Sequence, residues 1–168
     1  PRILATDIGH LKGRFRFVAR HGTGNQDPWD VLDQDFGDAI PAVADQTVLR
    51  WGLGLSVGDT LYYGGKDGRQ VKLLLIGGLA NSIFQGNVII SRDHFLRNFP
   101  SGGGSDVILA QITSPEDPTT ELLEETSREL AFLFSDQGWE IIPAVEKLRE
   151  FNSIENTYLA IFFLMGAF

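Results

Sequence analysis

Ser56 has a glycine two residues away on each side, a spacing that is found around the catalytic serines of some hydrolases. Gly54-Leu55-Ser56-Val57-Gly58 matches G-x-S-x-G, the turn on which α/β-hydrolases expose their nucleophile. That turn needs a strand before it and a helix after it, so that the serine stands clear of the sheet. Here the pattern predicts a helix before and a strand after. The sequence therefore favours a plain helix-to-strand turn over the alternative, a serine hydrolase that uses Ser56.

Carboxylates and histidines could hold a metal, but their spacing does not fit. Counting from Asp33, Gly37 falls at position five and Ala44 at position twelve, where a calcium loop needs glycine at six and glutamate at twelve. The three histidines lie far apart and share no ligand spacing. We expect helix caps and solvated loop carboxylates, with no metal and no cofactor in this domain. The residues considered are Asp27, Asp30, Asp33, Asp35, Asp38, Asp45, His10, His21 and His94.

The glycine-rich stretch Gly64–Gly68 resembles a phosphate loop only in composition. It lacks the G-x-x-x-x-G-K-[ST] spacing that aims backbone amides and a lysine at phosphate groups. Its Asp67-Gly68 pair instead indicates a hairpin turn, because glycine accepts a positive φ without a Cβ clash. The chain has no cysteine, so disulfides and thiol chemistry are excluded.

Composition indicates a folded globular protein of one domain or two small lobes. The 168 residues are 43% hydrophobic and 21% charged. The formal net charge is −8, which argues against nucleic acid as a partner, because a nucleic-acid-binding protein needs a basic face.

The elements that must position these residues centre on a hairpin. Thr60–Tyr63 and Gln70–Ile76 are predicted strands, Gly77-Gly78 is expected to end the second, and Asn87–Ile90 offers a third strand. Leu73–Ile76 is apolar throughout, which is typical of a strand covered on both faces. We predict that these three strands are adjacent and form the nucleus of the sheet.

Strands and helices alternate along the rest of the chain. This order predicts an α+β fold with a mixed β-sheet and packed helices. The further predicted strands are Arg14–Arg20, Ile40–Ala44, Asp106–Ile112 and Trp139–Pro143; the further predicted helices start after Asp27, Asp45, Ser91 and Asp117 and near Glu146, with Phe95, Leu96 and Phe99 facing inward.

The last residues carry no charge. Tyr158–Phe168 is apolar on every side, and at 11 residues it is too short to span a bilayer, which needs about 20. Two readings stay open: a buried C-terminal helix, or the start of a membrane span in a longer protein. The absence of an initiator Met before Pro1 predicts the same longer protein.

Five blocks together resemble a known family. They are Ile40–Asp45 (IPAVAD), Trp51–Leu61 (WGLGLSVGDTL), Val71–Ser91 (VKLLLIGGLANSIFQGNVIIS), His94–Ser101 (HFLRNFPS) and Leu148–Gly166 (LREFNSIENTYLAIFFLMG). In this order they resemble the extracytoplasmic, or periplasmic core, domain of FtsX-like permeases of the MacB-type ABC transporter family. The resemblance covers about residues 29–168, and residues 1–24 match nothing in it.

The resemblance implies a non-catalytic domain of a membrane protein. Residues 1–155 would form a MacB-like extracytoplasmic domain, and residues 156–168 would begin a truncated transmembrane helix. ATP would be bound by a separate ATPase subunit or domain, whose cycle the permease transmits across the membrane by mechanotransmission. The implied partners are that ABC ATPase, the membrane, and a periplasmic partner protein or amphiphilic cargo; the implied location is the outer side of the cell membrane.

One loop is the expected place of partner or cargo contact. Exposed loops on a rigid scaffold often carry binding, which points to Ala80–Asn87 with Asn81, Phe84 and Gln85, and to the glycine tract Ser101–Ser105. The alternative for the loop is a purely structural crossover. Trp51 and Phe84 are either contact residues or, more commonly for aromatic residues beside strands, core residues. The alternative for the whole chain is a membrane-anchored sensor that binds a small ligand in an apolar pocket.

Overall fold

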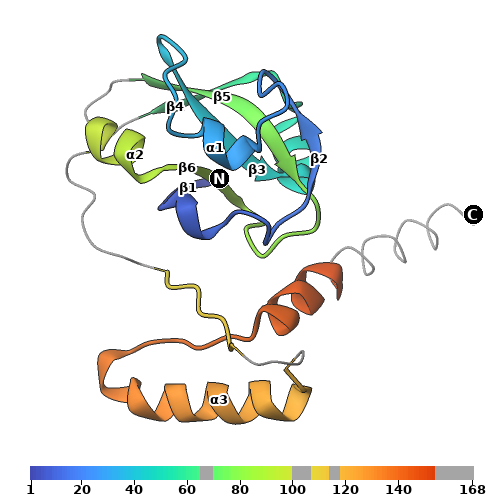
Figure 1. Cartoon of the computed structure of the whole chain (residues 1–168), viewed down its shortest axis with the longest axis vertical. Helices are drawn as coiled ribbons and strands as arrows, with labels where there is room; N and C mark the ends of the chain where they lie inside the picture. Colours follow the sequence, from blue (N-terminus) through green and yellow to red (C-terminus); the bar gives the residue numbers. More distant parts are fainter. Residues whose placement is uncertain (65–69, 100–106, 114–117, 154–168) are drawn as a thin grey trace, which may run out of the picture. The chain divides into compact units, whose positions relative to one another are not determined.

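The computed structural model describes residues 1–64, 70–99, 107–113 and 118–153. The chain divides into two compact units, unit 1 (Pro1–Gly104) and unit 2 (Ser105–Phe168). Unit 1 contains a six-stranded mixed sheet with short helices, and the regular secondary structure in the described part of unit 2 is helical (Figure 1). The predicted α+β class with a mixed sheet is confirmed at this level.

Six strands of unit 1 form one sheet in the order β1-β6-β3-β5-β2, with β4 also beside β5. β5 pairs parallel with β3 and antiparallel with both β4 and β2. β4 and β2 pair with successive stretches of β5, so the long strand organises the whole sheet. The bounds are β1 Arg2–Thr6, β2 Phe17–Arg20, β3 Ala39–Asp45, β4 Thr60–Gly64, β5 Gln70–Leu79 and β6 Asn87–Ser91.

The predicted hairpin is confirmed, but the predicted three-strand nucleus is wrong. β4 pairs with β5 from Thr60 opposite Leu74 to Gly64 opposite Gln70, and the turn between them lies outside the described residues. β3 lies between β5 and β6, parallel to the first and antiparallel to the second. β3 is buried over almost its whole length, and such a strand belongs inside a sheet, where both its edges and both its faces are covered.

Gly77 and Gly78 do not end β5, contrary to the prediction. The strand continues to Leu79, because the missing side chains let its neighbours come close. A Cβ at Gly77 would lie 2.7 Å from the Phe17 ring on β2 and 3.0 Å from a methyl group of Val43 on β3. A Cβ at Gly78 would meet the side-chain oxygen of Gln46. The glycine pair therefore allows the side chains of Phe17, Val43 and Gln46 to pack closely against β5.

Alanine at these two glycines should give unequal losses of stability. Gly77→Ala is expected to lower the free energy of unfolding by about 1–3 kcal/mol, because it overpacks a site bounded by an aromatic ring and a β-branched side chain. Gly78→Ala should cost less, since the flexible end of Gln46 can move away. Urea unfolding of both variants measures the difference; equal losses would contradict this account of Gly77.

Short helices cover the two faces of the sheet. On one face, Trp29 and Val31 of α1 (Pro28–Val31) pack with residues around η1 (Ile8–His10). On the other face, Leu49 of the π-helical turn η2 (Val48–Leu53) and Phe95 of α2 (Arg92–Asn98) cover the aliphatic side chains of β5 and β6. Unit 1 thus has a packed apolar layer on each side of its sheet.

Side-chain caps fix the starts of α1 and α2, as the sequence predicted. The Asp27 carboxylate accepts a hydrogen bond from the Trp29 N–H (3.0 Å), and the Ser91 hydroxyl accepts one from the His94 N–H (3.3 Å). In α2 the Phe95 and Phe99 rings pack inward, 5.1 Å apart. The inward position predicted for Leu96 is wrong, because the helix presents only one side to the sheet and Leu96 lies on the exposed side.

Unit 2 contains α3 (Thr120–Leu133), the short turn η3 (Ser135–Gln137), and helical residues 144–153. Gly138 follows η3 in the left-handed conformation, with a φ of 70°. The strands predicted at 106–112 and 139–143 are not formed in the described residues. A strand needs a partner, and a local pattern of apolar residues cannot supply one.

Among the residues that the structure describes, no helix is both long enough and apolar enough to cross a membrane. The predicted span at 156–168, the predicted cap Asp117 and the glycine tract at 101–105 lie outside the described residues.

Candidate functional site

The loop between β5 and β6 is held firmly on unit 1, and its three predicted contact residues differ in exposure. Asn81 is exposed and has a positive φ of 44°. Gln85 is half-buried, whereas Phe84 is only 7% exposed and packs on Phe15 with ring centroids 4.9 Å apart. The Phe84 ring is thus a core residue and offers no contact surface. Asn81 and Gln85 are the loop side chains that remain accessible.

A buried carboxylate ties this loop to the end of β3. Asp45 is fully buried, and one of its oxygens accepts hydrogen bonds from the backbone N–H (3.0 Å) and the hydroxyl (2.8 Å) of Thr47. Its other oxygen accepts the N–H of Ser82 at 2.6 Å. Asp45 therefore starts the predicted helical turn after β3 and also fixes the β5–β6 loop. The sequence indicated the first role and gave no sign of the second.

Trp51 is the most exposed large apolar side chain of the described residues. It is 82% exposed on η2, while Leu49 of the same turn is fully buried. The turn ends at Gly54 in the left-handed conformation, with its N–H donating to the Leu49 carbonyl. A π-helical turn inside a chain often marks a functional site. Tryptophan is also enriched at the energetic centres of protein interfaces. Trp51 is therefore the strongest candidate contact residue of unit 1.

Ser56 lies in the turn between η2 and β4, in the helix-then-strand order that the sequence predicted. The Asp59 carboxylate accepts the Ser56 N–H at 2.8 Å, and the Gly58 N–H donates to the Leu75 carbonyl at 2.7 Å. The His21 ring lies against Gly58. Among the described residues, no hydrogen bond joins the Ser56 hydroxyl to a histidine or a carboxylate. The observed contacts stabilise a turn and do not form a nucleophile–base pair.

His94 is a buried linking residue on α2. Its Nε2 lies 3.2 Å from the carbonyl of Gln34, and its Nδ1 lies 3.3 Å from an Arg97 guanidinium nitrogen. A neutral ring fits both contacts when Nε2–H donates to the carbonyl and Nδ1 accepts from arginine. Its burial and these two contacts indicate a structural role for His94 in the packing of α2.

The aspartates of residues 27–45 serve separate local roles. Asp27 is a helix cap, and Asp30 pairs with Lys12. Asp38 forms an exposed ion pair with Lys72 of β5, and the hydrogen bond and charge of the lysine lower the pKa of that carboxyl from its ordinary value. Within the described residues, no three His, Asp or Glu side chains come together in a way that could hold a metal ion.

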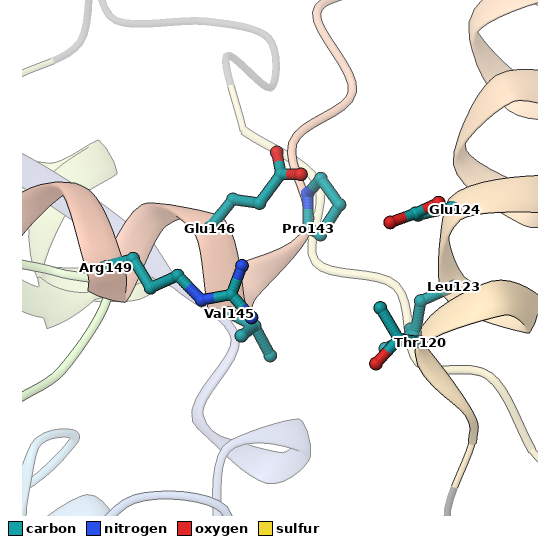
Figure 2. Close-up of a pocket in the computed structure, with 7 residues that line it drawn as sticks. All are labelled: Thr120, Leu123, Glu124, Pro143, Val145, Glu146 and Arg149. Atoms are coloured by element: carbon teal, nitrogen blue, oxygen red, sulfur yellow. The ribbon is translucent and has the colours of Figure 1, made fainter.

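Unit 2 has a small groove between α3 and the helical residues 144–153 (Figure 2). Its volume is about 50 Å³, well below the roughly 300–1,000 Å³ of pockets that enclose small-molecule ligands. Figure 2 shows the carboxylates of Glu124 and Glu146 and the guanidinium of Arg149 at this groove. The full lining is Thr120, Leu123, Glu124, Pro143, Val145, Glu146 and Arg149.

Comparisons with known proteins identify no relative: no family model, no curated protein and no solved structure matches this chain. The candidate contact residues described above are therefore identified from the geometry of the structure alone.

Proposed function

We propose that this chain is a non-catalytic extracytoplasmic domain of an ABC transporter permease of the FtsX-like, MacB-type family. In this proposal it couples ATP hydrolysis by a separate cytoplasmic ATPase to export or other work outside the membrane. The domain itself needs no cofactor. Its partners are the ATPase, reached through the parent permease, the membrane, and a periplasmic protein or an amphiphilic cargo.

The arrangement of the resembling blocks supports the proposal. The first four occupy β3, the turn from η2 into β4, the β5–β6 region and α2, so they belong to one packed sheet and its cover. The fifth block begins at Leu148, within helical residues 144–153. Contact residues for a partner or cargo would be Trp51, Asn81 and Gln85, which are accessible on this framework.

The helical residues 144–153 carry the proposed mechanism. They lead without a proline or glycine toward the uncharged segment Tyr158–Phe168. A continuous helix is stiff and would move the domain as a rigid body when the membrane part moves. We infer that this helix is the lever of the coupling.

Two glycines inserted after Asn152 should uncouple ATP hydrolysis from transport in the full permease. Glycine is a poor helix former, so the pair would break the lever while leaving the sheet of unit 1 intact. We expect ATP turnover to continue and export to fall by about tenfold or more. Two alanines inserted at the same point lengthen the helix without softening it, and serve as the control. Export that is unaffected by the glycine pair would contradict the lever.

The two alternative functions have weaker support. The groove of Figure 2, which described residues of unit 2 line, is smaller than the pocket that a small-ligand sensor needs. A serine hydrolase needs a base within hydrogen-bond reach of Ser56, and none bonds to it among the described residues. A serine-reactive probe that labelled Ser56 would restore the hydrolase hypothesis.

A further inference from the structure

Five strand ends of unit 1 meet at one edge of its sheet. β3 and β5 are parallel, and their last residues, Asp45 and Leu79, lie opposite each other at this edge. β6 is antiparallel to β3, β1 is parallel to β6, and β2 is antiparallel to β5, so these three strands begin at the same edge. We call it the loop edge, because the β5–β6 loop, residues 80–86, lies there.

Two arginines are bonded through their backbones to the two ends of this loop. The carbonyl of Arg16, just before β2, accepts the Ala80 N–H at 2.8 Å, and the N–H of Arg2 on β1 donates to the Gly86 carbonyl at 3.2 Å. Both arginines are exposed, and neither guanidinium forms an ion pair with another residue that the structure describes. Four inter-strand steps separate β1 from β2, which places the two backbones about 20 Å apart.

The loop edge is basic, whereas the whole chain has a net charge of −8. The segments that meet there contain three arginines and one acidic residue, Asp45, which is fully buried and accepts hydrogen bonds with both oxygens. Arg14 has an interaction of its own within the chain, which leaves Arg2 and Arg16 as the cations that face a partner. A local excess of positive charge favours an anionic partner. The segments are residues 1–2, 13–17, 45–47 and 79–87.

Two amide side chains of the loop lie between these arginines. Asn81 has a φ of 44°, and all other described residues with a positive φ are glycines. Glycine adopts this conformation at less cost, so the backbone gains nothing from the asparagine side chain. The Asn81 amide forms no hydrogen bond with another described residue, and within the same residues the Nε2 of Gln85 also has no partner. Both amides therefore have N–H donors for an acceptor on a partner.

We propose that the loop edge of unit 1 binds an extended acidic segment of a partner protein. Two carboxylates of that segment, about six residues apart, pair with Arg2 and Arg16, since six extended residues span about 20 Å. Between them the segment passes the loop, where Asn81 and Gln85 donate to its main-chain carbonyls. The inference deepens the proposed function, because it gives the chemistry of the partner at the expected contact loop.

Other anions fit this edge less well. A single phosphate group needs its donors within hydrogen-bond reach of one another, whereas Arg2 and Arg16 are about 20 Å apart. Recognition of an anionic lipid surface uses clusters of about four to eight basic residues, more than the three arginines found here. The wide spacing of two cations with neutral donors between them is matched by an extended polypeptide.

Peptides with a stiff spacer test the proposal on the full chain. The probe has a glutamate at each end of about five prolines, because polyproline is extended at about 3.1 Å per residue and holds the carboxylates about 19 Å apart. One control has the two glutamates adjacent and then the prolines, and the other has glutamine in place of both glutamates. We expect the spaced glutamates to bind most tightly, with an affinity that falls as salt rises, and to shift the amide NMR signals of Asn81 and Gln85.

Variants of the chain then locate the contact. Arg2→Gln and Arg16→Gln should each weaken binding of the spaced-glutamate peptide about fivefold, because each removes one charge-assisted pair. The double variant should bind this peptide no better than it binds the glutamine peptide. Arg92→Gln is the matched control and should leave the affinity unchanged, since Arg92 is also exposed but follows β6 at the opposite edge of the sheet. Urea unfolding checks that all variants stay folded.

Four results would overturn the proposal. Equal affinity for spaced and adjacent glutamates would remove the two-point contact, and unchanged affinity after both arginine substitutions would place the site elsewhere. Failure of every peptide to bind would show that this edge does not accept an acidic segment. Arginine-dependent binding to phosphatidylglycerol vesicles, without binding of the peptide, would assign the edge to lipid. None of these measurements involves transport, so this proposal and the permease proposal can fail separately.

Discussion

Asp45→Ala is expected to lower the free energy of unfolding of unit 1 by about 3 kcal/mol or more. The substitution leaves three donors without their acceptor: the Thr47 N–H, the Thr47 hydroxyl and the Ser82 N–H. Because Asp45 is fully buried, water cannot replace the carboxylate without entering the fold. The loss should appear as a lower midpoint in urea and as faster amide exchange at Ser82.

Asp35→Ala is the matched control for this prediction. Asp35 also accepts a backbone N–H, that of Gly37 at 3.1 Å, but the bond is exposed to water. Its loss should cost no more than about 1 kcal/mol. Asp45→Asn keeps the shape and one acceptor oxygen, so it should fall between the two. If Asp45→Ala and Asp35→Ala behaved alike, Asp45 would not be the link between β3 and the β5–β6 loop.

Local chemistry made much of unit 1 predictable. The cap residues Asp27 and Ser91 accept the hydrogen bonds that their types predict, and the glycine-containing turn joins two strands that pair as a hairpin. These features depend on residues close together in the chain, whose conformational preferences do not require contacts with distant parts of the sequence.

Long-range pairing was not predictable in the same way. The periodicity of β5 and β6 does not indicate that β3 lies between them. The apolar pattern of a strand reflects which of its faces are buried, not which strands pair with it. The link from Asp45 to Ser82 spans 37 residues and has no local signal. The segments 107–112 and 139–143 show the converse case: they have strand-like sequences but no strand structure, because β-structure depends on a second strand.

Candidate contact residues were the least predictable part. Phe84 and Trp51 both flank strands, and the sequence could not say which of them is buried. The structure places Phe84 in the core and Trp51 at the surface. The difference arises because Phe84 finds Phe15 and Trp29 in an aromatic cluster of the first face, whereas Trp51 lies on the outer side of η2. An exposed fraction is a property of the assembled sheet, not of the local pattern.

Trp29→Ala should be among the most damaging single substitutions in this chain. The Trp29 side chain is fully buried and contacts the rings of Phe15 and Phe17, with centroids 6.1 Å and 5.3 Å away. Truncation would leave a cavity under α1 and should lower the free energy of unfolding by about 3–5 kcal/mol. Urea unfolding measures the loss, and Trp29→Phe, which keeps most of the apolar volume, should recover part of it.

Trp51→Ala is the matched test at the surface, and its expected result is the opposite. With 82% of the side chain exposed, its removal should change the free energy of unfolding by no more than about 0.5 kcal/mol. If Trp51 is a contact residue of the proposed permease domain, the same variant should reduce transport or partner binding by about tenfold or more in the full protein. Full activity with Trp51→Ala would remove η2 from the contact surface and leave Asn81 and Gln85 as its candidates. Loss of stability would instead mean that the tryptophan is covered in the protein, so its exposure in unit 1 would no longer argue for a partner.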